Sequence, residues 1–374
     1  MSSPPSHAAR GPSDDRDRAN LGRLTGSRKL PQAFAERVIA WQRSHGRHGL
    51  PWQGRDPYRV WLSEVMLQQT QVATVLRFFE PFVARFPDVR ALAAASRDEV
   101  LALWSGLGYY GRARNLHRCA QVVVAEHGGA FPGRSEELAR LPGIGRSTAA
   151  AIAAFCFGER VAILDGNVKR VLARVLAFEA DPANGPAERE LWQRATAMLP
   201  ETNIEAYTQG LMDLGATLCT ARSPQCLVCP VHDVCAAACA GTQARFPVKS
   251  KRAVRGQRET LWLEMRWRGK VWLVQRPASG IWASLWSLPE FATVAELDAA
   301  AASWPGRSER LTAFTHVLTH LDWTLQPIRW TLPTRTTAAT VARLAARWPD
   351  GRWFDREEAL ALGLPAPLRK RLMA

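Results

Sequence analysis

Apolar residues recur at three- and four-residue spacings along the first two thirds of the chain, as expected of amphipathic helices. One such stripe predicts a single half-buried helix through Trp61, Val65, Val72, Val75, Leu76 and Phe79. The pattern turns helical at Ala33, and further helices are predicted over residues 97–104, 112–125, 135–140, 146–157, 166–177, 187–198 and 203–218. Because strand-like alternation is almost absent before Cys235, we predict an all-α unit of roughly 200 residues.

The period of the pattern changes beyond a basic stretch with few apolar residues. Leu261, Leu263 and Met265 occupy alternate positions, and Arg268–Gly269 then leads into a second such run, which predicts a β-hairpin. Ten of the fifteen tryptophans lie beyond residue 260, so this part has an aromatic core of its own. We therefore predict a second domain of the α+β class.

These changes divide the chain into four segments. Residues 1–30 contain no aromatic residue and are rich in Ser, Pro, Arg and Asp, so they cannot bury enough apolar surface to fold and are predicted to be a disordered tail. The all-α domain is predicted over residues 31–246, a basic linker over 247–258 and the α+β domain over 259–374.

Composition narrows the kind of partner. The 374 residues carry a net charge of +15, which points to a polyanion, with nucleic acid favoured over an anionic membrane surface. The chain has no run of eighteen apolar residues and no apolar signal core near its start, so we expect neither a membrane span nor secretion. The expected location is the cytoplasm, close to the nucleoid.

Four closely spaced cysteines are the strongest chemical signal. They follow the pattern C-x6-C-x2-C-x5-C at Cys219, Cys226, Cys229 and Cys235. Thiolates at this density suit one inorganic centre, and a zinc site would usually show two C-x2-C pairs instead. We predict a [4Fe–4S] cluster. Cys119 and Cys156 lie on apolar helix faces as core residues, and Cys239 is a fifth candidate whose spacing fits less well.

A glycine-containing turn separates two predicted helices at Leu141–Ser147. Gly143 and Gly145 permit a tight hairpin, and the helix that follows offers free N–H groups to a phosphate. A plain corner between two helices is the alternative, but the basic composition favours phosphate binding.

Two carboxylates stand out. Glu64 shares a polar face with Gln68 and Gln71, where a solvated glutamate is the simpler interpretation. Asp165 directly precedes an apolar helix and is expected to cap it, yet the following Gly-Asn also leaves an open turn. A pair of carboxylates, one acid and one charge stabiliser, is the arrangement used to break glycosidic bonds.

The turn Gly106–Tyr110 carries aromatic side chains between glycines and is followed by Arg112 and Arg114. Aromatic wedges on such turns can enter a base stack and fill the gap left by an extruded base. Packed tyrosines on an ordinary turn are the alternative.

Five motifs within residues 33–235 resemble those of the MutY-type adenine DNA glycosylases of the helix-hairpin-helix superfamily, and they occur in the same order as in that family. They are Trp61–Val72, Gly106–Tyr110 with Arg112, Leu141–Ser147, Leu164–Arg170 and the four cysteines. The resemblance implies an enzyme whose partner is double-stranded DNA and whose substrate is adenine opposite 8-oxoguanine or guanine. We expect a monomer by default.

The resemblance also implies roles for individual residues. Glu64 would protonate adenine and later help to activate water, and Asp165, supported by Asn167, would stabilise the cationic sugar. The predicted DNA-binding residues within this domain are Gln68, Gln69, Leu107, Tyr109, Gly143, Gly145 and Ser147. Bifunctional relatives such as endonuclease III carry a lysine where this chain has Ser147, so no Schiff base can form there and little or no strand cleavage is expected.

The C-terminal domain resembles the Nudix-like domain of the same family. The segment after Pro289 lacks the glutamate-rich helix that would hold magnesium, so we expect binding rather than hydrolysis. Leu318-Thr319-His320 corresponds to the family's lesion-sensing Phe-Ser-His turn, with Thr319 and His320 as its predicted contacts.

Two other functions remain open from the sequence. One is a bifunctional, endonuclease III-like glycosylase for oxidised pyrimidines, and the other is a non-catalytic, cluster-bearing sensor of DNA damage. Ser147 argues against the first, and the presence of both Glu64 and Asp165 argues against the second. Because these carboxylates lie far upstream of the cysteines, we predict that the cluster is a structural clasp and DNA-docking element.

Overall fold

The computed structural model describes residues 29–250 and 255–373, so most of the predicted tail and residues 251–254 of the predicted linker lie outside it. The chain divides into two compact units, each discontinuous in sequence. The first runs up to Glu64 and resumes over Phe131–Lys251; the second joins Val65–Ala130 to Arg252–Ala374. None of the helices in the described ranges is long and apolar enough to cross a membrane.

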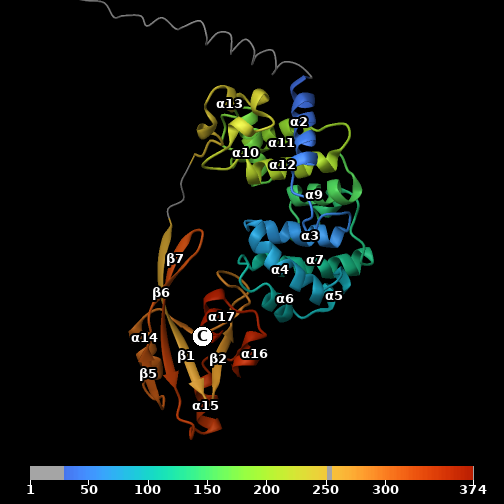
Figure 1. Cartoon of the computed structure of the whole chain (residues 1–374). Helices are drawn as coiled ribbons and strands as arrows, with labels where there is room; N and C mark the ends of the chain where they lie inside the picture. Colours follow the sequence, from blue (N-terminus) through green and yellow to red (C-terminus); the bar gives the residue numbers. More distant parts are fainter. Residues whose placement is uncertain (1–28, 251–254, 374) are drawn as a thin grey trace, which may run out of the picture. The chain divides into compact units, whose positions relative to one another are not determined.

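The first unit is helical (Figure 1). Its longer helices are α2 (Lys29–His45), α3 (Pro57–Leu67), which continues into the second unit, α9 (Arg146–Phe157), α10 (Gly166–Val175), α11 (Gly185–Ala197) and α12 (Ile204–Thr217). Short helical segments are α8 (Ser135–Leu138), η1 (Cys226–Val228), η2 (His232–Val234), α13 (Ala236–Cys239) and η3 (Gln243–Arg245). The helices predicted between residues 135 and 218 are confirmed, each within a few residues of its predicted bounds.

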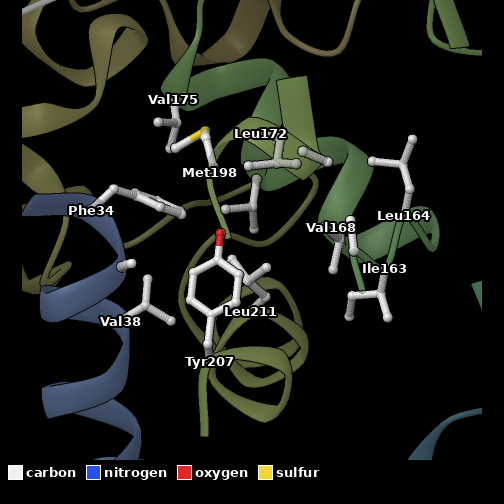
Figure 2. Close-up of a cluster of buried hydrophobic side chains, with 14 of the residues drawn as sticks. Phe34, Val38, Ile163, Leu164, Val168, Leu172, Val175, Met198, Tyr207 and Leu211 are labelled. Atoms are coloured by element: carbon white, nitrogen blue, oxygen red, sulfur yellow. The ribbon is translucent and has the colours of Figure 1, made fainter. Parts of the chain in front are cut away.

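A single hydrophobic core holds α2, α10 and α12 together (Figure 2). Phe34 of α2 meets the ring of Tyr207 of α12 edge-on, with ring centroids 6.3 Å apart. Leu172 and Val175 of α10 are buried in the same core. Each such side chain contributes about 1.5–3 kcal/mol through burial. This packing fixes the direction of α10, whose first turn presents Asp165.

The helices of the second unit are α4 (Val72–Arg85), α5 (Val89–Ala94), α6 (Arg97–Leu103) and α7 (Gly111–His127). The prediction of one helix from Trp61 to Phe79 is wrong, because α3 ends at Leu67 and a turn precedes α4. Gln69 in that turn has a φ of +56°, which a continuous helix does not allow. Leu76 is 40% exposed, so the apolar stripe does not continue through it.

The described part of the C-terminal segment forms an eight-stranded mixed sheet. Its strands are β1 (Gly256–Trp267), β2 (Lys270–Gln275), β3 (Trp286–Ser287), β4 (Glu290–Phe291), β5 (Arg307–Arg310), β6 (Phe314–Val317), β7 (Leu321–Thr331) and β8 (Gly351–Phe354). The main strand order is β3-β2-β1-β7-β5, while β4 pairs with β1, β6 with β7 and β8 with β2. Strands β1 and β7 run parallel, and the remaining pairs are antiparallel.

The hairpin predicted around Arg268–Gly269 is confirmed, with positive φ at both residues as a two-residue turn requires. Four helices accompany the sheet: α14 (Val294–Ala301), α15 (Ala338–Ala345), α16 (Arg356–Leu360) and α17 (Ala366–Met373). Tryptophans fill much of the core, as predicted, with Trp262 and Trp323 fully buried. One charged side chain, Glu264 of β1, is also buried there, at 1% exposure.

Candidate active site and cluster site

Asp165 lies at the N-cap of α10. Its Oδ1 accepts a hydrogen bond of 2.7 Å from the backbone N–H of Val168, so the predicted capping role is confirmed. Ile163 and Leu164 are buried just before it and anchor the approaching chain. The carboxylate is thereby fixed at the positive end of the helix dipole.

Arg170, one turn further along α10, ties this capping turn to the first cysteine of the run. Its guanidinium donates to Asn167 Oδ1 at 2.8 Å, to the carbonyl of Gly215 at 2.6 Å and to the carbonyl of Cys219 at 2.7 Å. A Cβ at Gly215 would lie 2.7 Å from Asn167 Cβ, so glycine is required for this close approach of α12 to α10. Asn167 is therefore held beside Asp165, and the predicted supporting position has a structural basis.

Glu64 is carried by α3, where Trp61 and Val65 face the core as predicted. Burial, reinforced by the negative charge of Asp165, raises the pKa of Glu64 from 4.5 to about 8. The side chain is half-buried, so the simpler interpretation of a fully solvated glutamate does not fit. At neutral pH this side chain carries a proton that it can donate.

The two carboxyls have different surroundings. Burial also raises the pKa of Asp165, but the backbone N–H groups of Val168 and Asn167 and the nearby cations Arg170 and Lys169 oppose that rise. No hydrogen bond to the Glu64 carboxyl occurs within the described ranges. Asp165 therefore has donors and cations that favour its charged form, whereas the neighbouring charge of Asp165 disfavours the charged form of Glu64.

The predicted hairpin connects α8 to α9. Gly143 has a φ of +76°, and Gly145 is the exposed N-cap of α9 with open space around its Cα. The side chain of Ser147 turns inward: its Oγ accepts a 3.0 Å hydrogen bond from the backbone N–H of Leu164. Ser147 thus supports the extended segment that leads into Asp165, while the glycines leave backbone N–H groups at the surface.

The second unit holds the turns predicted to enter DNA. Gln69 and Tyr109 are exposed, and both have left-handed backbone conformations, with φ of +56° and +49°. Gln68 is half-buried, whereas Leu107 is buried at 6% exposure. Insertion of these four residues into a duplex stays a prediction, with Gln69 and Tyr109 as its exposed members.

The turn predicted to sense the lesion joins β6 to β7. Thr319 and His320 are exposed at its tip. The hydroxyls of Thr319 and Tyr109 lie 2.6 Å apart, so this unit brings together two residues that are 210 positions apart in the sequence. Their proximity could not be derived from either motif alone.

The four predicted cysteine ligands line one cavity of about 390 Å³, a volume that includes its opening to solvent. No three His, Cys, Asp or Glu side chains converge on a single ion within the described part of the chain. Four cysteines that line one shared volume suit an iron–sulfur cluster, which Cys thiolates hold. Arg174 donates to Cys219 Sγ at 3.2 Å, as expected near a thiolate. Cys119 is buried, as predicted, and Cys239 does not line the cavity.

Burial raises the pKa of Cys229 to about 11 and that of Cys235 to about 12. The free thiols therefore stay protonated at neutral pH, and assembly of an iron–sulfur centre must release their protons. Arg112, Arg170 and Arg174 are not among the predicted site residues, yet each donates hydrogen bonds to backbone carbonyls that position the site. Such contacts leave no motif, since any residue can supply a carbonyl.

Three family models match the chain. The model of the HhH-GPD superfamily base excision DNA repair proteins covers residues 62–196, the iron-sulfur binding domain of endonuclease III covers residues 219–235, and the NUDIX domain covers residues 261–374. These matches confirm the predicted helix-hairpin-helix domain, the [4Fe–4S] cluster at the four cysteines and the Nudix-like domain.

Curated relatives are similar along most of the chain. The adenine DNA glycosylase of Buchnera aphidicola subsp. Schizaphis graminum is 31% identical over 344 residues, which cover 91% of this chain and 97% of the relative. The human adenine DNA glycosylase is 33% identical, covering 90% of this chain and 73% of the relative. The adenine DNA glycosylase of Mycobacterium tuberculosis is 40% identical over 242 residues, which cover 63% of this chain and 76% of the relative.

Solved structures resemble the helical part. A thermostable thymine-DNA glycosylase superposes with a TM-score of 0.51 at 26% identity, covering 56% of this chain and 97% of that one. A non-covalent endonuclease III–DNA complex superposes with a TM-score of 0.50 at 20% identity, covering 57% and 97%, which supports the fold alone.

Proposed function

Since this chain belongs to the adenine DNA glycosylases, which bind DNA and hydrolyse N-glycosyl bonds in base excision repair, we propose that its substrate is adenine opposite 8-oxoguanine or guanine. We propose further that it removes the base without cleaving the strand. The observation that carries the chemistry is the unequal pair of carboxyls: Asp165 accepts a hydrogen bond from the backbone N–H of Val168 at the N-cap of α10, whereas burial raises the pKa of Glu64.

In the proposed reaction the Glu64 carboxyl donates its proton to N7 of the extruded adenine. The bond between N9 and C1′ then breaks, and its electron pair leaves with the base. The Asp165 carboxylate stabilises the positive charge that develops on the sugar. Glu64, now ionised, accepts a proton from water as the water oxygen bonds to C1′. This returns the pair to its starting protonation state.

Recognition of the opposite base is supported by the 2.6 Å approach of Thr319 to Tyr109. Tyr109 lies on the proposed wedge turn, and Thr319 on the turn that corresponds to the family's lesion-sensing motif. Tyr109 would stack next to the orphaned base as a wedge, and the Thr319 hydroxyl would exchange a hydrogen bond with the edge of that base. Together the two side chains would recognise it. Both lie in the same compact unit.

Absence of strand cleavage is supported by Ser147. Its hydroxyl accepts a hydrogen bond from the backbone N–H of Leu164, the residue directly before Asp165, and provides no amine at that position. Without an amine no Schiff base to C1′ forms there, and water becomes the final nucleophile.

The cluster, when bound, supplies iron–thiolate bonds that tie the loop of residues 219–235 together. Cys219 and Cys229 also pack against the core of the first unit, which supports the proposed structural role of the cluster. We expect Cys229→Ser to lower folding yield and DNA affinity before it lowers the excision rate of the folded fraction.

The test is single-turnover excision from duplexes that carry adenine opposite 8-oxoguanine, guanine or thymine, followed by alkali. We expect fast, alkali-dependent breaks with 8-oxoguanine, slower ones with guanine and none with thymine. Equal rates on all three duplexes would refute the proposed specificity. A covalent adduct trapped by borohydride would refute the proposed monofunctional mechanism.

A further inference from the structure

Arg112, in the first turn of α7, donates hydrogen bonds to an unusually large set of acceptors. Its Nη1 lies within 2.8 Å of three carbonyl oxygens, and its Nη2 within 3.3 Å of two more and of one hydroxyl. The acceptors are Val65 O, Met66 O, Gln68 O, Thr70 Oγ1, Leu107 O and Gly108 O. The first four belong to the end of α3 and the turn after it, and the last two to the turn before α7.

No carboxylate in the described ranges forms an ion pair with Arg112, so its charge is compensated by dipoles. Burial lowers the pKa of Arg112 to about 10, which leaves it cationic at neutral pH. Val65 and Met66 lie in the last turn of α3, whose free carbonyls favour a cation. The guanidinium also lies over the Tyr109 ring, 5.5 Å from its centroid.

Both turns that Arg112 joins are strained at one residue. Gln69 and Tyr109 have positive φ, which costs roughly 1–2 kcal/mol for a residue with a side chain. Their side chains are exposed, and Tyr109 is 47% exposed, an unusual position for a large aromatic. Such strain persists only where the surroundings impose it, and Arg112 donates hydrogen bonds to both turns.

We infer that Arg112 is a positioning residue that fixes the turns Gln68–Thr70 and Leu107–Tyr109 as one wedge, so that Gln69 and Tyr109 enter the base stack together when adenine is extruded. This inference rests on the proposed function. Arg112 does not contact the reacting atoms; it acts through the two exposed side chains. Its loss therefore affects extrusion of the base and leaves bond cleavage in an already extruded base intact.

The test compares two substrates in single-turnover assays. One is adenine opposite 8-oxoguanine in a full duplex; the other is adenine opposite an abasic-site analogue, where no partner base or pairing resists extrusion. For Arg112→Met we expect the first rate to fall about 10- to 100-fold, because misplacing a positioning group by about 1 Å has that effect. The second rate should fall less than about threefold.

Two variants sharpen the result. Arg112→Lys keeps the charge but cannot reach both sets of carbonyls, so it should lose most of what Arg112→Met loses. Arg118→Met removes the same charge from an exposed position on α7 and should match the wild type on both substrates. With Glu64→Gln added to prevent excision, 2-aminopurine at the target position should fluoresce less in the Arg112 variants than in Glu64→Gln alone.

The outcomes separate the inference from the proposed function. A wild-type protein that fails to excise adenine opposite 8-oxoguanine refutes the proposed function. If the wild type is active, an equal fall on both substrates, or no fall, overturns the role of Arg112. Should Arg112→Met not fold, as judged by thermal unfolding and cluster absorbance, Thr70→Val removes a single acceptor. It should then show the same preference for the abasic-analogue substrate at about a threefold effect.

Discussion

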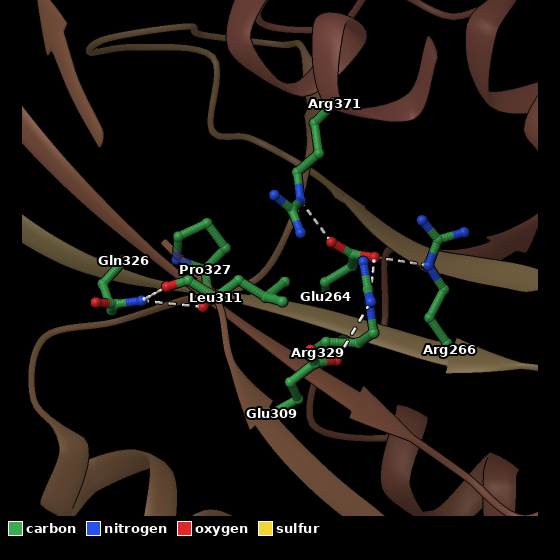
Figure 3. A network of polar contacts seen from close by, with 8 residues as sticks. All are labelled: Glu264, Arg266, Glu309, Leu311, Gln326, Pro327, Arg329 and Arg371. Atoms are coloured by element: carbon green, nitrogen blue, oxygen red, sulfur yellow. Dashed lines mark hydrogen bonds and ion pairs between the residues drawn. The ribbon is translucent and has the colours of Figure 1, made fainter. Parts of the chain in front are cut away.

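Two glutamates withdrawn from solvent, Glu64 in the helical unit and Glu264 in the C-terminal sheet, have opposite electrostatic surroundings. The Glu264 carboxylate accepts hydrogen bonds at 2.5–3.2 Å from three arginine side chains (Figure 3). These are Arg266 of β1, Arg329 of β7 and Arg371 of α17. Glu64 has the charge of the half-buried Asp165 near it, and within residues 29–250 and 255–373 no cation or hydrogen-bond donor lowers its pKa.

The surroundings shift the two pKa values in opposite directions. Burial alone would raise the pKa of Glu264, but the hydrogen bonds and charges of Arg371 and Arg266 outweigh it and hold the pKa below 4.5. Burial and Asp165 raise that of Glu64 to about 8. A buried acid surrounded by cations holds the fold together, whereas a buried acid without them stores a proton at a cost in stability. The comparison therefore separates a structural carboxylate from a reactive one.

The largest effect is expected from removing the stored proton. Glu64→Gln cannot donate to adenine, so the single-turnover excision rate should fall about 1,000-fold or more, while affinity for the substrate duplex, measured by gel shift, is retained. Glu264→Gln is the matched control and should leave the excision rate of the folded protein within a few-fold of the wild type. Excision by Glu64→Gln at the wild-type rate would remove Glu64 from the mechanism.

The next effect concerns stability. Glu264→Ala leaves three half-buried guanidinium groups without their carboxylate and should lower the free energy of unfolding by about 3–5 kcal/mol. Urea unfolding followed by tryptophan fluorescence reports on this sheet, because ten of the fifteen tryptophans lie beyond residue 260. Glu309, an exposed partner of Arg329, supplies the control: Glu309→Ala should cost less than about 1 kcal/mol. Equal costs for the two variants would show that the arginines do not depend on Glu264.

Local sequence patterns predict only part of the difference between Glu64 and Glu264, because the surroundings of each carboxyl come largely from residues far away in the chain. The helices between residues 135 and 218 and the Arg268–Gly269 hairpin follow from local periodicity and turn chemistry, which the sequence displays directly. The candidate carboxylates and cysteines follow from the spacing of motifs. Glu264, however, occupies an alternate position of β1 that a one-sided strand would expose, and its partner Arg371 lies 107 residues away.

The break between α3 and α4 is hidden for a related reason. The intervening turn, which includes Gln68 and Gln69, contains neither Gly nor Pro, and the apolar spacing continues across it. Its left-handed residue is stabilised by Arg112, whose hydrogen bond to Gln68 O spans 44 positions. Neither the turn nor its stabilising arginine has a local signal.

A smaller effect, and one of opposite sign at the two glutamates, is expected in the pH dependence of stability. Between about pH 4.5 and about pH 8 the folded state keeps the Glu64 proton that the unfolded state loses, so rising pH lowers the free energy of unfolding. For Glu264 the folded pKa is depressed, so its contribution is present above pH 4.5 and is lost as pH falls through the folded value. The free energy of unfolding, measured at pH 5 and at pH 8, should therefore differ less in Glu64→Gln than in the wild type, by roughly 1–3 kcal/mol. An unchanged difference would contradict a buried, protonated Glu64.

The smallest effect tests which neighbour perturbs Glu64. Asp165→Asn removes the second cause of the raised pKa and leaves the first, burial, in place. The pKa of Glu64, followed by carboxyl carbon NMR, should therefore fall below 8 but stay above 4.5. Asp181→Asn, at a half-buried carboxylate of the same unit that is not among the causes of the Glu64 shift, should leave the pKa of Glu64 unchanged. A pKa that returns to 4.5 in Asp165→Asn would mean that charge rather than burial prepares Glu64 as an acid, and the contrast with Glu264 would then rest on one neighbouring charge.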